Sequence, residues 1–155
     1  MRSFIRFFNS LKSQRYFSII IHSAPGTGLS RFASRAADQL NADYINLQDL
    51  FLNDHEFKNK IPGFSYEDLL SFLKLRVKSG KPIFLDKVDF LIDTWREDNL
   101  KALLNLLRRQ WDTSSKTFNV PLVVFVESAP WLEGINIKFS DGGSKIFKLS
   151  QFNAL

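Results

Sequence analysis

The sequence has 155 residues, of which 45% are hydrophobic and 24% are charged, and it contains no cysteine. These values suit a single globular domain, and they exclude disulfide bonds and thiolate metal sites. No stretch approaches the roughly 20 consecutive apolar residues that a membrane-spanning helix needs, so we expect a cytoplasmic protein that is not in a membrane.

The basic residues that give the net charge of +5 are concentrated near the start of the chain. Residues 1–37 hold six basic residues and no acid, whereas residues 38–155 hold 15 basic and 16 acidic residues. A local basic patch of this kind attracts nucleic acid, phosphate or an acidic partner. The side chains that we expect to contact nucleic acid are those of Arg2, Arg6, Lys12 and Arg15.

Residues 1–16 are predicted to form an amphipathic basic helix, because their apolar positions share one helical face: Phe4, Ile5, Phe8 and Leu11. The Arg- and Ser-rich composition is also typical of a mitochondrial presequence. We favour a helix that packs on a following domain of residues 17–155, because apolar core sequence begins directly after it. Three phenylalanines of the helix are candidates for an exposed patch that contacts a partner: Phe4, Phe7 and Phe8.

Strand patterns and helix patterns alternate through the rest of the chain, which predicts an α/β fold with a mainly parallel sheet covered on both faces. The expected strands are residues 16–21, 43–47, 82–85, 121–126 and 145–149, with a weak strand at 135–139. The expected helices are residues 30–40, 65–79 and 94–111. We expect residues 48–64 to form a loop that includes a helical turn.

Two of these helices carry start signals. Ser65 is followed three residues later by Asp68, and Thr94 is followed three residues later by Glu97. Both pairs resemble a capping box, in which the first side chain accepts a bond from the first helical turn. Gly80 is a natural stop for the first of the two helices.

The segment HSAPGTGLSR, residues 22–31, has the strand-turn-helix setting that a phosphate-binding loop requires. Gly26 and Gly28 allow the backbone N–H groups to point inward, where they and the helix N-terminus can bind an anion. The expected nucleotide contacts are Pro25, Gly26, Thr27, Gly28, Leu29, Ser30 and Arg31, and the Ser30 hydroxyl is also expected to bind Mg²⁺.

This loop departs from the full pattern G-x-x-x-x-G-K-[ST] at Ser23 and at Leu29, which takes the place of the lysine. That lysine normally places a positive charge against the terminal phosphates. Its loss is expected to cost about 1.5–3 kcal/mol of binding, or roughly tenfold to a hundredfold in affinity. Arg31 is the candidate that would compensate.

A second motif, PIFLDKVD, spans residues 82–89. Its apolar strand ends in Asp86, which we expect to hold Mg²⁺ through a water molecule. The next residue is Lys87, a cation that cannot serve as the base for an attacking water. Asp89 and Glu127 are the remaining candidates for a catalytic role.

The two motifs resemble those of the AAA+ ATPases. The loop APGTGLS is similar to their APGTGKS, and IFLDKVDFL is similar to their Walker B segment. VVFVESAP resembles the strand that ends in a polar sensor, at Glu127 or Ser128, and KIFKLSQF resembles the fifth strand of initiator-like (DnaA- and Hda-like) members. The resemblance implies a three-layer core with strand order 5-1-4-3-2, and ATP or ADP with Mg²⁺ as ligands that bind weakly or not at all. We expect one departure from the family, the absence of its helical lid after the fifth strand.

The size and layout also resemble the BrxF proteins of BREX phage-defence systems, which have a similar second strand, here residues 44–47. A flavodoxin-like module is the alternative fold. We therefore expect a degenerate P-loop subunit or adaptor, without robust ATPase activity, in a nucleic-acid-associated complex, with a protein partner or a second copy of itself. The alternatives are an atypical ATPase or kinase that uses Arg31, and a DNA-binding accessory protein that uses its basic N-terminal face.

Overall fold

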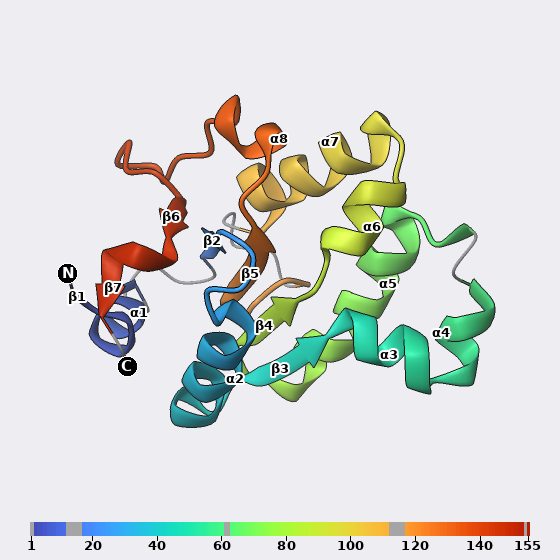
Figure 1. The fold of residues 1–155 in the computed structure, drawn as a ribbon, viewed down its shortest axis with the longest axis horizontal. Helices are drawn as coiled ribbons and strands as arrows, with labels where there is room; N and C mark the ends of the chain where they lie inside the picture. The colour runs from blue at the N-terminus through green and yellow to red at the C-terminus, as the bar shows by residue number, and fades with distance from the viewer. Residues whose placement is uncertain (1, 12–16, 61–62, 112–116, 154) are drawn as a thin grey trace.

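The structure is a computed structural model that describes residues 2–11, 17–60, 63–111, 117–153 and 155. A sheet of five parallel strands, in the order β3-β4-β5-β2-β6, forms its centre (Figure 1). The strands are β2 (Ser18–Ser23), β3 (Asp43–Asn46), β4 (Ile83–Asp86), β5 (Leu122–Glu127) and β6 (Ile146–Lys148). If these five strands are numbered 1 to 5 along the chain, from β2 to β6, their order in the sheet is the expected 5-1-4-3-2. The predicted α/β class is confirmed, and the predicted mainly parallel sheet is parallel throughout.

Helices cover both faces of the sheet, which gives three layers (Figure 1). They are α1 (Phe4–Leu11), α2 (Leu29–Leu40), α3 (Leu47–Asn53), α4 (His55–Lys60), α5 (Tyr66–Arg76), α6 (Asp89–Thr94), α7 (Glu97–Asn105) and α8 (Pro130–Glu133). A 3-10 turn (Val77–Ser79) extends α5, a π-helical turn (Leu106–Gln110) extends α7, and a second 3-10 turn (Leu149–Gln151) follows β6. Among the described residues, no helix combines the length and the apolar character that crossing a membrane requires.

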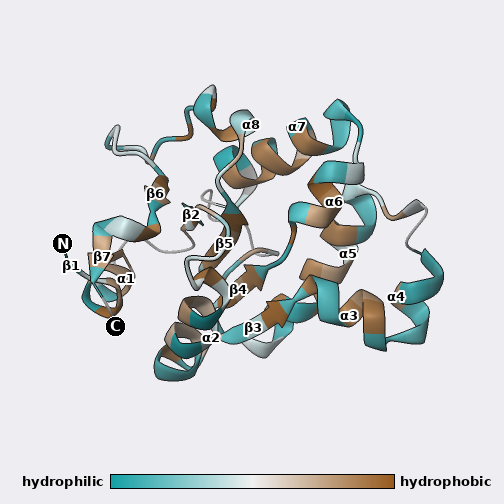
Figure 2. Cartoon of the chain, viewed as in Figure 1, coloured by the Kyte–Doolittle hydropathy of each residue, from teal (hydrophilic) through white to brown (hydrophobic). Residues whose placement is uncertain are grey.

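Alternation along the strands explains the two apolar clusters. On β4, Ile83 and Leu85 belong to the cluster beneath α5 and α7, whereas Phe84 between them belongs to the cluster beneath α1 and α2. On β5, Val123 and Phe125 join Phe84, and their neighbours face the other side. Figure 2 shows the resulting brown strands at the centre and a mostly hydrophilic α4 at the periphery. Both faces of the sheet are therefore buried, as a parallel sheet requires.

The first helix is part of this core. The Phe4 ring is fully buried and makes edge-to-face contacts with Phe32, Phe84 and Phe152. Phe7 and Phe8 are also buried, so the expectation of an exposed aromatic patch is wrong. The reason is that α1 lies against α2 and the sheet rather than outside them.

Two short strands that the sequence did not predict lie beside this helix. β1 (Arg2–Ser3) pairs in parallel with β7 (Phe152–Asn153). This pairing brings the beginning and the end of the described chain side by side (Figure 1). It also places Phe152 over the ring of Phe4, which closes the cluster beneath α1.

The predicted loop at residues 48–64 is wrong, because α3 and α4 occupy most of it. Asn46 caps α3 by accepting a bond from the backbone N–H of Asp49. Leu47 and Phe51, four residues apart, then bury one face of this helix. A short helix with two buried side chains leaves a weak periodic signal.

The remaining predictions concern helix ends and a short strand, and they are confirmed only in part. The capping box at Ser65 and Asp68 is confirmed, and Gly80 ends the following turn with φ 74°. Thr94 does not begin a helix: it ends α6, and α7 begins at Glu97 with Arg96 at its cap. The expected strand at residues 135–139 is reduced to an isolated bridge between Lys138 and Ser144.

Replacing Phe4 by alanine should lower the free energy of unfolding by about 3–5 kcal/mol, because it opens a cavity among several rings. Urea denaturation of the full chain measures the loss. Leu75→Ala is the control, since Leu75 is 63% exposed and should change stability by no more than about 0.5 kcal/mol. Equal effects of the two substitutions would contradict the placement of α1 in the core.

Candidate functional site

The turn between β2 and α2 is built by two glycines in the left-handed conformation. Gly26 has φ 78°, and Gly28, at the cap of α2, has φ 80°. Residues other than glycine rarely adopt this backbone conformation. The Thr27 hydroxyl oxygen lies 2.6 Å from Ser23 Oγ and 2.7 Å from the Ala24 carbonyl oxygen, which closes the loop on itself. No side chain caps the N-terminus of α2, so its first N–H groups are available to an anion.

Leu29 turns away from this loop into the core. Its side chain is only 9% exposed and belongs to the cluster that includes Ala33, Ala36 and Ala37 of the same helix. The residue at the lysine position of a phosphate-binding loop therefore helps to fix α2 on the sheet. The loop keeps its backbone donors without this lysine charge.

A cavity of about 530 Å³ lies over the loop and the ends of β4 and β5. All the residues predicted to bind nucleotide or Mg²⁺, and both catalytic candidates, line this cavity: Pro25, Gly26, Thr27, Gly28, Leu29, Ser30, Arg31, Asp86, Asp89 and Glu127. Ala24 and Lys87 complete the lining. The cavity is thus at the carboxyl ends of parallel strands, where ligands of open α/β sheets bind.

Asp86 is the buried acid of this cavity, with 1% exposure. Its Oδ2 accepts a hydrogen bond from the Tyr44 hydroxyl at 2.6 Å, and its Oδ1 accepts one from the Lys87 backbone N–H at 2.8 Å. The Ser30 side chain lies close enough to the same hydroxyl to lower the pKa of Tyr44, against the larger effects of burial and Asp86. The Tyr44 hydroxyl therefore bonds Asp86 and lies near Ser30, the two residues predicted to bind Mg²⁺.

Burial, and secondly the hydrogen bond to Asp86, raise the pKa of Tyr44 well above its usual range. The phenol accordingly stays protonated and acts as a donor at neutral pH. Tyr44 is not among the residues that the sequence predicts for the site. The available signal was a tyrosine in the strand expected to lie beside the one that ends in Asp86.

The two catalytic candidates are joined by a backbone bond. Asp89 Oδ1 accepts the Glu127 N–H at 2.8 Å, which connects the start of α6 to the end of β5. Burial raises the pKa of Asp89, the bond from Glu127 opposes this shift, and the charges of Glu127 and Asp86 add to it. Lys87, just before this helix, has φ 62°. Such a conformation in a non-glycine residue is uncommon and occurs at functional sites.

The charges that line the cavity are mixed. The three acids Asp86, Asp89 and Glu127 face the two cations Arg31 and Lys87. A polyphosphate would meet a small excess of negative charge, and a divalent cation would compensate it. Among the described residues, no group of three or more His, Asp or Glu side chains is arranged to hold a metal ion. A cation here would therefore take part of its shell from phosphate and water, as Mg²⁺ does at nucleotide sites.

The polar residues at the end of β5 divide between two cavities. Glu127 lines the cavity over the glycine loop, whereas Ser128 lines a neighbouring one of about 490 Å³ with His22 and Lys148. His22 Nδ1 lies 2.8 Å from Ser128 Oγ. Burial, and secondly the charge of Lys148, lower the pKa of His22, so the imidazole is neutral at pH 7.

The residues predicted to contact nucleic acid do not all lie free on the surface. The guanidinium of Arg2 is 4.1 Å from the centroid of the Phe7 ring, a cation–π contact. Arg6 is exposed on α1. Lys12 and Arg15 lie outside the described residues.

Comparison with known proteins shows that no family model matches the sequence and that no curated protein matches it.

Changing Asp89 to asparagine should remove part of the pH dependence of stability. Because the pKa of Asp89 is raised in the folded state, the folded chain binds its proton more tightly, and stability falls as pH rises above the unfolded value of about 3.8. The asparagine oxygen can still accept the Glu127 N–H. Urea titrations between about pH 4 and pH 7 should therefore show a smaller decrease in Asp89→Asn. Asp93→Asn, an exposed residue of the same helix, should retain the wild-type slope.

Tyr44→Phe should lower the free energy of unfolding by about 1–3 kcal/mol, since a buried carboxylate loses a donor. Tyr66→Phe is the matched control, because its hydroxyl has no hydrogen bond within the described part of the chain. Urea denaturation of both variants at neutral pH measures the difference. Equal stability of the two would show that the bond to Asp86 contributes nothing.

Proposed function

We propose that this chain binds a nucleotide such as ATP or ADP, with Mg²⁺, in the cavity over the glycine loop, and that it hydrolyses the nucleotide poorly or not at all. One observation carries the proposal: two left-handed glycines open α2 directly across one cavity from the acid that ends β4, Asp86. Backbone donors at a helix N-terminus favour phosphate, and a carboxylate opposite them favours the cation that accompanies it.

Three features support weak binding and poor hydrolysis. Leu29 is committed to the core, so the usual lysine charge is absent. The Tyr44 hydroxyl already bonds Asp86, and Mg²⁺ would have to share or displace it. Lys87, at the position of the usual base, is a cation, so a proton from water would have to go to Asp89 or Glu127.

The resemblance to initiator-like AAA+ proteins and to BrxF supports a role as a cytoplasmic subunit or adaptor in a nucleic-acid-associated complex, of which phage defence is one setting. Arg31 lines the cavity, and this supports the alternative in which the chain is an atypical ATPase or kinase with Arg31 in place of the lysine.

Calorimetric titration of ATP and of ADP, with and without Mg²⁺, tests the proposal. We expect binding that needs Mg²⁺ and that is lost in Gly28→Ala, because a side chain strains a loop with φ 80°. Gly80→Ala is the matched control: Gly80 has φ 74° and similarly open surroundings, but it lies outside the cavity. Leu29→Lys should bind about tenfold to a hundredfold more tightly than the wild type. If neither the wild type nor Leu29→Lys bound nucleotide, the proposal would be refuted.

Phosphate release separates the non-hydrolysing protein from the atypical enzyme. We expect no release above background from the wild type. Turnover that Asp86→Ala abolishes would contradict this expectation. If Arg31→Ala then lost affinity while Arg35→Ala, exposed on the same helix, kept it, Arg31 would be the substitute for the lysine.

A further inference from the structure

The edge strand β3 has one side without a strand neighbour. β3 ends the five-stranded sheet, and within the described chain it pairs only with β4. The Asp43 backbone N–H donates to the Pro82 carbonyl, so Asp43 directs its backbone groups toward β4. Because these directions alternate along a parallel strand, Tyr44 and Asn46 direct theirs away from the sheet.

A groove of about 770 Å³ runs beside this free edge. Tyr44, Ile45 and Asn46 all line it, although consecutive side chains of a strand point to opposite faces. A cavity that touches all three residues must lie at the edge of the strand, and β4 occupies the other edge. Its volume is in the range of binding sites for small ligands and short peptides.

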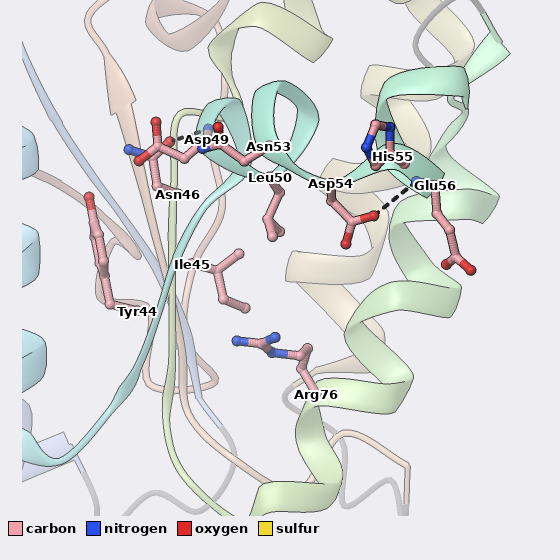
Figure 3. Close-up of a pocket in the computed structure, with 10 residues that line it drawn as sticks. All are labelled: Tyr44, Ile45, Asn46, Asp49, Leu50, Asn53, Asp54, His55, Glu56 and Arg76. Carbon is pink, nitrogen blue, oxygen red and sulfur yellow. Dashed lines mark hydrogen bonds between the residues drawn. The ribbon is translucent and has the colours of Figure 1, made fainter.

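The groove has an apolar floor and an acidic rim. Figure 3 shows Ile45 and Leu50 between the guanidinium of Arg76 and the carboxylates of Asp49 and Asp54. Glu56 adds a further carboxylate at the start of α4.

The rim charges lack cationic partners. Arg76 is the basic residue beside them, and its guanidinium makes two bonds of 2.7 and 2.8 Å to Asp43. Among the residues that the structure describes, Asp49, Asp54 and Glu56 form no ion pair. Metal binding does not explain the rim either, since the described side chains contain no metal-holding group.

We propose that this groove binds a short, basic, extended segment of a partner protein, which adds to the free edge of β3 as a sixth strand. Unpaired strand-edge groups bind such segments through main-chain hydrogen bonds, and alternate side chains supply specificity. Here the apolar floor at Ile45 and Leu50 accepts the aliphatic side chains. The rim carboxylates attract the lysine or arginine side chains. The groove and the cavity over the glycine loop are separate sites, since they have no lining residue in common.

A fluorescent peptide of alternating valine and lysine, blocked at both ends, is a direct probe for the full-length chain. Fluorescence anisotropy should detect binding that weakens with salt, and amide hydrogen exchange should slow at Tyr44 and Asn46. A peptide of alternating valine and glutamate should not bind. A valine–lysine peptide N-methylated at alternate residues should also fail, because it cannot complete the ladder. Equal binding of either control peptide would overturn the proposal, as would no binding of the first.

The rim is tested by the triple variant Asp49→Asn, Asp54→Asn, Glu56→Gln, which we expect to raise the dissociation constant of the valine–lysine peptide about tenfold. The triple variant Asp38→Asn, Asp93→Asn, Glu133→Gln is charge-matched, alters exposed acids outside the groove and should bind like the wild type. Equal losses would assign the effect to net charge and overturn the proposal. Light scattering that showed a wild-type dimer, dissociated by the rim variant, would also overturn it in favour of a second copy of the chain.

Discussion

The need to satisfy one buried carboxylate organises the candidate site. Asp86 is almost completely shielded from water, so the chain must supply its hydrogen-bond donors. One donor comes from Tyr44 on the neighbouring strand and the other from the backbone N–H of Lys87, whose left-handed conformation turns the chain sharply after β4. This arrangement fixes the ends of two strands and the start of α6 around the same cavity.

The glycine loop is supported in a similar way from the opposite side. Leu29 and the small residues of α2 pack on the sheet, and the small side chains allow the helix to lie close to it. A lysine in place of Leu29 would need to leave that apolar contact in order to reach a phosphate. Leu29 therefore holds the helix on the sheet, and it leaves the cavity without the positive charge that a lysine would supply.

The sequence predicted the features that depend on long, regular patterns. The alternation of apolar strands and helices was sufficient for the α/β class, and the motif resemblance supplied the strand order that the structure has. The glycines of the loop and Asp86 also come together as their spacing implied. What the sequence did not predict depends on contacts between distant segments. The bond from Tyr44 to Asp86 depends on the register between β3 and β4, and the contact of Phe4 with Phe152 depends on the pairing of β1 with β7. The short helices α3 and α4 bury too few side chains to leave a clear period.

Tyr44 belongs to both regions of the molecule at once. Its backbone lies at the free edge of the sheet, and its hydroxyl bonds Asp86 in the cavity over the glycine loop. If a bound segment shifted Tyr44, its hydroxyl would move relative to Asp86 and Ser30. A cation that displaced the hydroxyl would in turn shift the edge strand β3. Two ligands linked through one such residue influence each other's affinity by the same factor. If both proposed ligands bind, Tyr44 would couple the groove beside β3 to the cavity over the glycine loop.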